Sequence, residues 1–407
     1  MAAHRMFNYV LTLKRFGADV EQEHAPGSLI TLCPLCPQPC INMDPNWRDA
    51  PESESYLHAL FYGTDGNFHL CHNAKKMDLL DTALGDGAGS CVNSARYRHY
   101  LSKMAVYDDL QEETSGCSNF TALSDRYKGK IATGQVSLSC IRHGLLLPCG
   151  TVDLHAGERY MNVDYATLCG LERFLDLNLH ISSYDVNCKY GIHFWSRLRQ
   201  IAAALPSVPG VMHDRSDWPV IRRMLPKGHA NAHKGICKYF YSPYYLLGIG
   251  NTDGESVERN WSLMNATGRS VREMTPGHRQ DVIEAHNADT NIRKLFRTSE
   301  HPVVFRLRVL TPRPGHYLKV KLERAIKLYD KHKAELEDME STLQMNARPL
   351  DKWRDDVAMY LSRVKDGEIT MDIYNPYIPV KDEGKHSIRA NFAVLTLRST
   401  DYARRTR

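Results

Sequence analysis

Residues 177–184 show the two-residue alternation of a β-strand, and Asp185 follows them directly. Apolar residues then recur at helical spacing over 192–202, so this stretch predicts a strand that leads into a helix. Such units build sheets flanked by helices, and we predict an α/β fold with a mixed sheet. An acid at the C-terminal end of a strand is a common place for an active-site group. It is equally an ordinary helix cap, and this segment does not decide between the two.

A second acid, Asp65, lies within an aromatic and apolar segment, residues 56–71. We interpret this segment as a buried strand, with Asp65 at the point where the apolar run breaks. A carboxylate in that position requires a metal ion, a cationic partner or a turn. The alternative is an Asp-Gly turn that joins two strands.

A glycine-rich segment before Trp261 predicts the start of a further helix, with Thr252 or Asp253 as its cap. Glu255 and Glu258 would lie on one face of that helix, because side chains three positions apart are neighbours. Trp261 gives the same face an apolar anchor. A rigid acidic helix edge can present a carboxylate to a metal ion. The alternative is that both glutamates only complement the helix dipole.

Composition narrows the class of protein without fixing it. The chain has 407 residues, 43% of them hydrophobic and 24% charged, which is typical of a globular protein with two or three domains. Its net charge of +5 permits a polyanionic partner such as nucleic acid. We find neither a signal peptide nor a membrane span in the sequence, and expect an intracellular protein. The glycine-rich residues 85–90 lack the Lys-Ser/Thr ending of a phosphate-binding loop, which excludes a nucleotide triphosphatase.

Several cysteines and histidines have metal-ligand spacing. Cys33 and Cys36 form a Cys-x2-Cys knuckle, which lets two thiolates reach one zinc ion. No second such pair follows at zinc-ribbon distance, so the local ligand set is incomplete, and a proline-stiffened loop with buried thiols is the alternative. Cys140 and His143 form a Cys-x2-His pair at the turn between two strands predicted within 136–155, which is half of a zinc site.

A third group of zinc candidates is His229, His233 and Cys237, which recur every four residues and would share one helical face. Ala230 stands where a His-Glu-x-x-His metalloprotease has its general base, so protease chemistry is unsupported. A structural zinc site that combines these residues with the Cys-x2-His pair above is one interpretation. The alternative is a polar helix with scattered histidines.

Three acids thus follow one another in the order strand, strand and helix, which is the layout of ribonuclease-H-like nucleotidyl transferases. The chain also resembles the Kyakuja-Dileera-Zisupton (KDZ) transposase family over roughly residues 32–297. The resemblance depends on ten sequence elements in one order: CPLCP at 33–37, TDGNFHL at 64–70, ETSGCSN at 113–119, CIRHG at 140–144, GERYMNVDY at 157–165, SYDVNC at 183–188, HANAHKGIC at 229–237, TDGESVERNW at 252–261, REMTPGHR at 272–279, and the pair Asp289-x-Asn291.

This resemblance implies a DDE-type transposase with a ribonuclease-H-like core that cuts and joins DNA at transposon ends. Carried onto the matching positions, the catalytic and metal-binding acids are Asp65, Asp185 and Glu258, with Glu255 as the less favoured third acid. The implied cofactor is Mg²⁺ or Mn²⁺, because two divalent ions about 4 Å apart can activate the attacking oxygen and stabilise the leaving oxygen. Magnesium prefers hard oxygen ligands, which carboxylates supply. The resemblance also implies a nuclear location and leaves room for a homo-oligomer.

We expect three parts in the chain: an N-terminal helix with the Cys/Pro knuckle over 1–45, a ribonuclease-H-like core with a loop-rich insertion over 46–297, and a helical extension with a basic tail over 298–407. The sequence begins shortly before CPLCP, so we expect it to lack the cysteine-rich DNA-binding segment that often precedes this core. The alternative function is therefore a catalytically inactive or domesticated protein that binds DNA and zinc.

Overall fold

The protein is represented by a computed structural model. It describes residues 2–74, 81–105, 129–155, 157–211, 218–233, 237, 240–244, 246, 248–298 and 316–342. The chain forms two compact units, Met1–Ala232 with Asn251–Phe296, and His233–Gly250 with Arg297–Arg407. The predicted boundaries near residues 45 and 297 stay a prediction.

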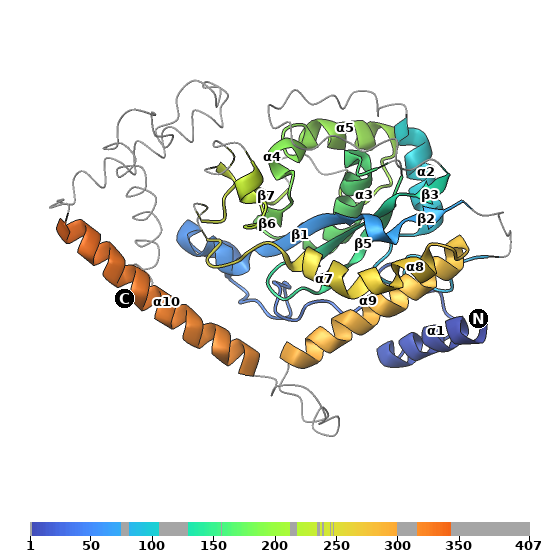
Figure 1. Cartoon of the computed structure of the whole chain (residues 1–407), viewed down its shortest axis with the longest axis horizontal. Helices are drawn as coiled ribbons and strands as arrows, with labels where there is room; N and C mark the ends of the chain where they lie inside the picture. Colours follow the sequence, from blue (N-terminus) through green and yellow to red (C-terminus); the bar gives the residue numbers. More distant parts are fainter. Residues whose placement is uncertain are drawn as a thin grey trace. The chain divides into compact units, whose positions relative to one another are not determined.

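A five-stranded mixed sheet forms the centre of the first unit (Figure 1), in the order β5-β4-β1-β6-β7. β1 pairs antiparallel with β4 and β4 with β5, whereas β1, β6 and β7 run parallel. This arrangement confirms the predicted α/β class with a mixed sheet. β2 and β3 form a second, two-stranded sheet. The strands are β1 (Leu60–Asn67), β2 (His72–Asn73), β3 (Lys130–Ala132), β4 (Gly134–Cys140), β5 (Leu146–Leu154), β6 (Leu179–Ser183) and β7 (Val220–Met224).

The register of the central pair decides where the two aspartates lie. Gly63 of β1 is the partner of Ser183 of β6 in the parallel pairing. Asp65 and Asp185 each follow two residues later, so both lie at the same end of neighbouring strands. Their proximity follows from strand direction, because the carboxyl ends of parallel strands meet at one edge of a sheet.

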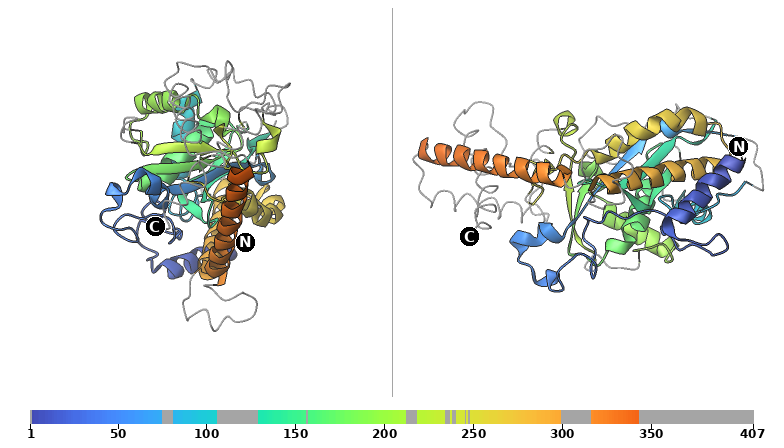
Figure 2. Two further views of the ribbon diagram at one scale, coloured as in Figure 1. Left: turned by 90° about the vertical axis from the view of Figure 1, so that its left-hand side faces the viewer. Right: turned by 90° about the horizontal axis from the view of Figure 1, so that it is seen from below.

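Helices cover both faces of this sheet (Figures 1 and 2), with α3 and α5 on one face and α7, α8 and α9 on the other. The helices are α1 (Ala2–Phe16), α2 (Ser94–Met104), α3 (Tyr160–Leu171), α4 (Asn187–Tyr190), α5 (Phe194–Ala204), α7 (Ser256–Met264), α8 (Gly268–Val271), α9 (Pro276–Thr298) and α10 (His316–Thr342). Short 3-10 turns are η1 (Trp47–Asp49), η2 (Glu52–His58), η3 (Phe68–Leu70), η6 (Glu172–Phe174), η7 (Ala230–Ala232) and η8 (Asn265–Thr267).

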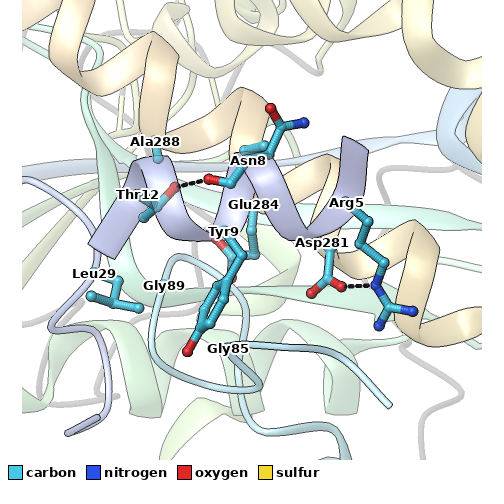
Figure 3. Close-up of a pocket in the computed structure, with 11 residues that line it drawn as sticks. Arg5, Asn8, Tyr9, Thr12, Leu29, Gly85, Gly89, Asp281, Glu284 and Ala288 are labelled. Carbon is cyan, nitrogen blue, oxygen red and sulfur yellow. Dashed lines mark hydrogen bonds and ion pairs between the residues drawn. The ribbon is translucent and has the colours of Figure 1, made fainter. Parts of the chain in front are cut away.

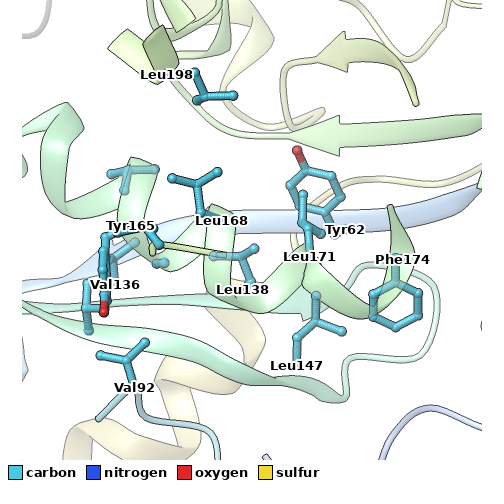
Figure 4. Packing of buried hydrophobic residues seen from close by; sticks show 14 of the residues in the cluster. Tyr62, Val92, Val136, Leu138, Leu147, Tyr165, Leu168, Leu171, Phe174 and Leu198 are labelled. Carbon is cyan, nitrogen blue, oxygen red and sulfur yellow. The ribbon is translucent and has the colours of Figure 1, made fainter. Parts of the chain in front are cut away.

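The main core lies between the sheet and α3 (Figure 4), where Leu138 of β4 packs among Leu168 and Leu171 of the helix. These three leucines are completely buried. Burial of a leucine contributes about 1.5–3 kcal/mol, so this layer holds the sheet in a fixed shape. On the opposite face, Val257 and Trp261 of α7 pack with Ile283 of α9. The helix that carries the two glutamates is therefore fixed against β1.

One sequence prediction needs correction. His229 lies in a turn before η7, and His233 lies in a bend after it, so the predicted single helix through these residues is wrong. The region between β2 and β3 contains α2 and the ordered turns at 82–93, while ETSGCSN lies outside the described residues. The loop-rich insertion stays a prediction. The strand β7 was not predicted, because its sequence VIRRM lacks an alternating pattern.

In the second unit, α10 lies within the region 298–407 that was predicted to be helical. Pairs such as Lys331 and Glu335, whose charged atoms lie 3.6 Å apart, run along it. Its apolar residues Leu322 and Ile326 are exposed. The rest of the predicted extension from residue 343 onward, with its basic tail, lies outside the described residues. None of the helices that the structure describes combines the length and hydrophobicity that crossing a membrane requires.

Candidate active site

Asp65 lies in the second half of β1 and is partly buried. Its Oδ2 accepts a hydrogen bond of 2.9 Å from Nε1 of Trp261 on α7. The tryptophan was predicted to be only an apolar anchor for its helix. The structure shows that its indole also orients the carboxylate of Asp65, and that α7 packs directly against β1.

Glu158 is a fourth acid that sequence reasoning missed. It lies two residues before α3, and Tyr184 donates a hydrogen bond of 2.8 Å to its Oε1. A Cβ atom on Gly66 would lie 2.7 Å from Glu158 Oε2, so a side chain after Asp65 would require this carboxylate to move. The only sequence signal was its place in GERYMNVDY, at the start of a helix predicted over 158–180, where an acid is not unusual.

Asp185 lies two residues after the end of β6 and two residues before α4. The neighbouring Ser183 donates a hydrogen bond of 3.1 Å from its Oγ to the carbonyl of Gly254. Gly254 has φ +83°, and a side chain there would also meet Ser183 Oγ. This close approach fixes the loop before α7 beside the strand end that carries Asp185.

The structure separates the two glutamates of α7. Glu255 is the N-cap, in place of the predicted Thr252 or Asp253, and Asp253 Oδ1 accepts a bond of 3.1 Å from its amide. Glu255 Oε1 accepts a hydrogen bond of 2.5 Å from the amide of Gly228. Glu258 Oε1 instead lies 3.6 Å from His229 Nε2. Glu258 Oε2 is buried and has no hydrogen-bond donor among the described residues.

The pKa shifts show that four of these carboxylates influence one another. Burial first, and then repulsion from Glu158, Asp185 and Glu258, raises the pKa of Asp65 well above its ordinary value. Burial and repulsion from Asp185 raise the pKa of Glu158 to about 8, against the hydrogen bond from Tyr184. Burial also raises the pKa of Glu258, with Glu255 and Asp185 adding repulsion.

The carboxylate oxygens of these four acids lie farther apart than the ligand atoms of a single metal ion. Within the described part of the chain, no three of the four carboxylates have oxygens that all lie within 4.8 Å of one another. Ligands of an ion pair are spread over a larger volume, because the two ions themselves are about 4 Å apart. Buried carboxylates that repel one another favour either a bound proton or a cation between them.

A separate cluster joins the two half-sites that the sequence predicted. Cys33, Cys36, Cys140 and His143 each place one ligand atom within 4.8 Å of the others, and this set is compatible with zinc. The Cys140–His143 pair is thus completed by the N-terminal knuckle, so its predicted combination with the segment at 229–237 is wrong. His229 lies beside Glu258. His233 and Cys237 belong to the second unit, and their zinc role stays a prediction.

The sequence can be compared with known protein families, curated proteins and solved structures. A sequence model of the Kyakuja-Dileera-Zisupton transposases matches residues 58–291. The chain belongs to this transposase family. No curated protein and no solved structure matches it. The matched region of this KDZ family member contains Asp65, Glu158, Asp185 and Glu258. Membership implies a protein that binds DNA.

A hollow on the surface of this KDZ transposase lies next to Glu258. Its lining includes His229, Glu255, Glu258, Arg259 and Ser262. His229 and Arg259 are the basic side chains of this lining, and they border its carboxylates. Basic side chains are the groups that contact phosphates in nucleic acids.

A second hollow, between α1 and α9 (Figure 3), has a structural explanation. Arg5 forms an ion pair with Asp281 across it. Glu284 accepts hydrogen bonds of 2.8 Å and 2.6 Å from the amides of Ser90 and Cys91. These polar groups join the helices to the ordered turns at 82–93. The carboxylates are thus occupied in holding the fold together.

Proposed function

We propose that this KDZ transposase cuts and joins DNA strands with divalent cations held by Asp65, Asp185 and Glu258, on a ribonuclease-H-like core. The support for that core is the strand order: a three-stranded antiparallel meander continued by two parallel strands, with acids on the first strand, at the end of the fourth and on a later helix. The observation that carries the proposal is that the register of β1 and β6 brings Asp65 and Asp185 to the same end of neighbouring strands. Burial, and then repulsion from Glu158, Asp185 and Glu258, raises the pKa of Asp65 there.

The donor set fits Mg²⁺ or Mn²⁺. All the candidate ligands are carboxylate oxygens, which are the hard ligands that these ions prefer. Glu258 Oε2 is a buried oxygen with no donor among the described residues, so it is open to a cation. Two such ions, when bound, would activate the attacking oxygen and stabilise the leaving one.

The chain's own residues would orient the reaction. Trp261 fixes the carboxylate of Asp65 through its indole N–H. The Ser183–Gly254 contact holds the end of β6 against the start of α7, which keeps Asp185 and Glu258 on the same side of the sheet. His229 and Arg259 border Glu258, and we propose that they contact the DNA backbone.

Glu258 is the better third acid. Its charge acts on Asp65, and that of Asp185 acts on it in turn. Glu255 is held by the amide of Gly228 at the helix N-terminus, where a carboxylate is stabilised by the dipole.

Glu158 would complete the site as a supporting acid. Its pKa of about 8 means that it holds its proton at neutral pH and adds little negative charge to the cluster. The hydrogen bond from Tyr184 to Oε1 fixes this carboxyl group in place. We extend the proposal to transposon ends as the DNA partner and to action in the nucleus; a homo-oligomer would bring two such ends together.

The experiment is nicking of supercoiled plasmid DNA in Mg²⁺ and in Mn²⁺, which needs no knowledge of the end sequence. Wild type should nick the plasmid, and Asp185→Asn should lose at least about 100-fold in rate, as expected for removal of a metal ligand. Asp176→Asn, which changes an exposed aspartate before the opposite end of β6, is the matched control and should retain activity. If wild type binds DNA but cuts it with neither ion, the alternative of a binding-only protein is correct.

A further inference from the structure

The Cys33–Cys36–Cys140–His143 cluster, called here the knuckle cluster, combines residues from separate parts of the chain. Cys33 and Cys36 lie in a tight turn in which the amide of Cys36 donates a 3.2 Å bond to the Cys33 carbonyl. Cys140 ends β4, and His143 lies in the turn that follows. His143 Nδ1 lies 3.2 Å from Cys33 Sγ and 3.4 Å from Cys140 Sγ. The three cysteines are free and buried.

These separations are close to those of a tetrahedral zinc shell. With Zn–S bonds of about 2.3 Å and Zn–N bonds of about 2.0 Å, neighbouring ligand atoms lie roughly 3.5–3.8 Å apart. Three thiolates and one imidazole nitrogen make a complete four-ligand set, which leaves no position for a water or a substrate. Sites of this kind hold a fold together and do not catalyse reactions.

Hydrogen bonds connect the turn of the knuckle cluster to α7, the helix that carries Glu258. Ser256 of α7 donates a 3.3 Å bond from its Oγ to the Cys140 carbonyl. Asn260 of α7 donates a 3.1 Å bond to the carbonyl of Gly144, in the same turn as His143. Glu258 lies between these two residues on the helix. The turn between Cys140 and Gly144 therefore positions α7 through hydrogen bonds on both sides of the glutamate.

A second helix holds the same region. Asn291 of α9 accepts a 2.8 Å bond from the Leu146 amide and donates a 2.9 Å bond to the Thr31 carbonyl. Lys294 of α9 donates a 2.5 Å bond to the Gly144 carbonyl. The N-terminal segment, the β4–β5 turn and both helices thus meet around the knuckle cluster.

We propose that Cys33, Cys36, Cys140 and His143 bind one structural zinc ion, and that this ion braces α7 by fixing the 140–144 turn. Zinc binding itself is independent of the proposed DNA chemistry. Only the consequence for Glu258 rests on the proposed function.

Metal analysis of the full-length chain, purified from zinc-supplemented cells, tests the site. Cys33→Ser should contain one zinc ion fewer per chain than wild type. Cys40→Ser is the matched control, because Cys40 is an exposed cysteine of the same segment outside the cluster, and it should retain the wild-type zinc content. Equal zinc in wild type and Cys33→Ser would overturn the proposal, and so would the absence of zinc from wild type.

Cobalt replacement in the wild-type chain avoids the risk that a variant fails to fold. The cobalt form should show the absorption of a tetrahedral thiolate site, and Cys33→Ser should lose this absorption while Cys40→Ser keeps it. An octahedral cobalt spectrum in wild type would overturn the assignment.

Hydrogen exchange tests the bracing of α7. Removal of zinc by a chelator should accelerate exchange in residues 256–264 at least tenfold, while the α3 amides on the other face of the sheet stay protected. Unchanged exchange in α7 after confirmed zinc loss would overturn the bracing role. Neither measurement depends on DNA cleavage, so failure of the zinc site and failure of the proposed function remain distinguishable.

Discussion

Trp261→Phe should separate the orientation of Asp65 from the packing of α7. The substitution keeps an aromatic ring in the buried position but removes the indole N–H that lies 2.9 Å from Asp65 Oδ2. A hydrogen bond to a charged acceptor contributes about 1.5–3 kcal/mol. If the bond acts by holding the carboxylate in its productive direction, its loss should slow cleavage by about 10- to 100-fold, since about 1.4 kcal/mol corresponds to a factor of ten.

The protein contains a matched control for this variant. Trp218 is also buried, and its Nε1 donates a bond of 3.2 Å to the Gly210 carbonyl, but it packs in the other core, with α5. Trp218→Phe makes the same chemical change and should destabilise the fold by a similar amount, about 1–2 kcal/mol.

The assay is plasmid nicking under single-turnover conditions, combined with urea unfolding of both variants. We expect both variants to lose stability and only Trp261→Phe to lose cleavage rate. Wild-type cleavage by Trp261→Phe would refute the orientation role of the indole. An equal loss in Trp218→Phe would attribute the effect to general destabilisation.

Three further predictions concern neighbouring residues. Glu258→Gln should abolish nicking, whereas Glu255→Gln should keep at least a tenth of the wild-type rate; the reverse order would make Glu255 the third acid. Because the pKa of Glu158 is raised from 4.5 to about 8, the native state holds the extra proton between these values, and stability must fall as pH rises through this window. In urea unfolding without divalent ions, the free energy of unfolding should therefore fall between pH 5 and pH 8.5, and this fall should be about 1–3 kcal/mol smaller in Glu158→Gln than in wild type. Equal falls in the two proteins would contradict the raised pKa of Glu158. Arg279→Met should lower the free energy of unfolding by about 3 kcal/mol, because buried Arg279 donates hydrogen bonds to both oxygens of Asp153 and to the Leu70 carbonyl. The control Arg293→Met changes an exposed arginine and should lower it by less than about 1 kcal/mol.

Local periodicity was sufficient to predict three of the strands in the sheet. The alternation over 177–184 and the paired segments within 136–155 correspond to β6, β4 and β5. The edge strand β7 could not be predicted in this way, because its two arginines interrupt the apolar pattern and Val220 is 64% exposed. Its place in the sheet comes from parallel pairing with β6, which is a tertiary interaction.

A site residue could be predicted only where an acidic residue occupies an unusual position in the local sequence pattern. Asp65 and Asp185 stand out because an acid within or after an apolar strand is unusual. Glu158 precedes a helix, where acids are common, and its importance depends on Gly66 and Tyr184, which are distant in sequence.

The zinc half-sites and the two glutamates illustrate the same limit. Each Cys-x2-Cys or Cys-x2-His pair has recognisable spacing, but Cys33 and His143 are 110 residues apart, so their pairing depends on the fold. Helical spacing places Glu255 and Glu258 on one face. Only the amide of Gly228, brought in from the loop after β7, distinguishes them.

Direct measurement of Mn²⁺ binding tests the central claim without DNA. Electron paramagnetic resonance titration should detect two Mn²⁺ ions per wild-type chain. Asp65→Asn and Asp185→Asn should each lose binding of at least one, and exposed Asp176→Asn should lose neither. Equal Mn²⁺ binding by wild type and both site variants would contradict the account, because the carboxylates at the end of β1 and β6 would then not be the ligands.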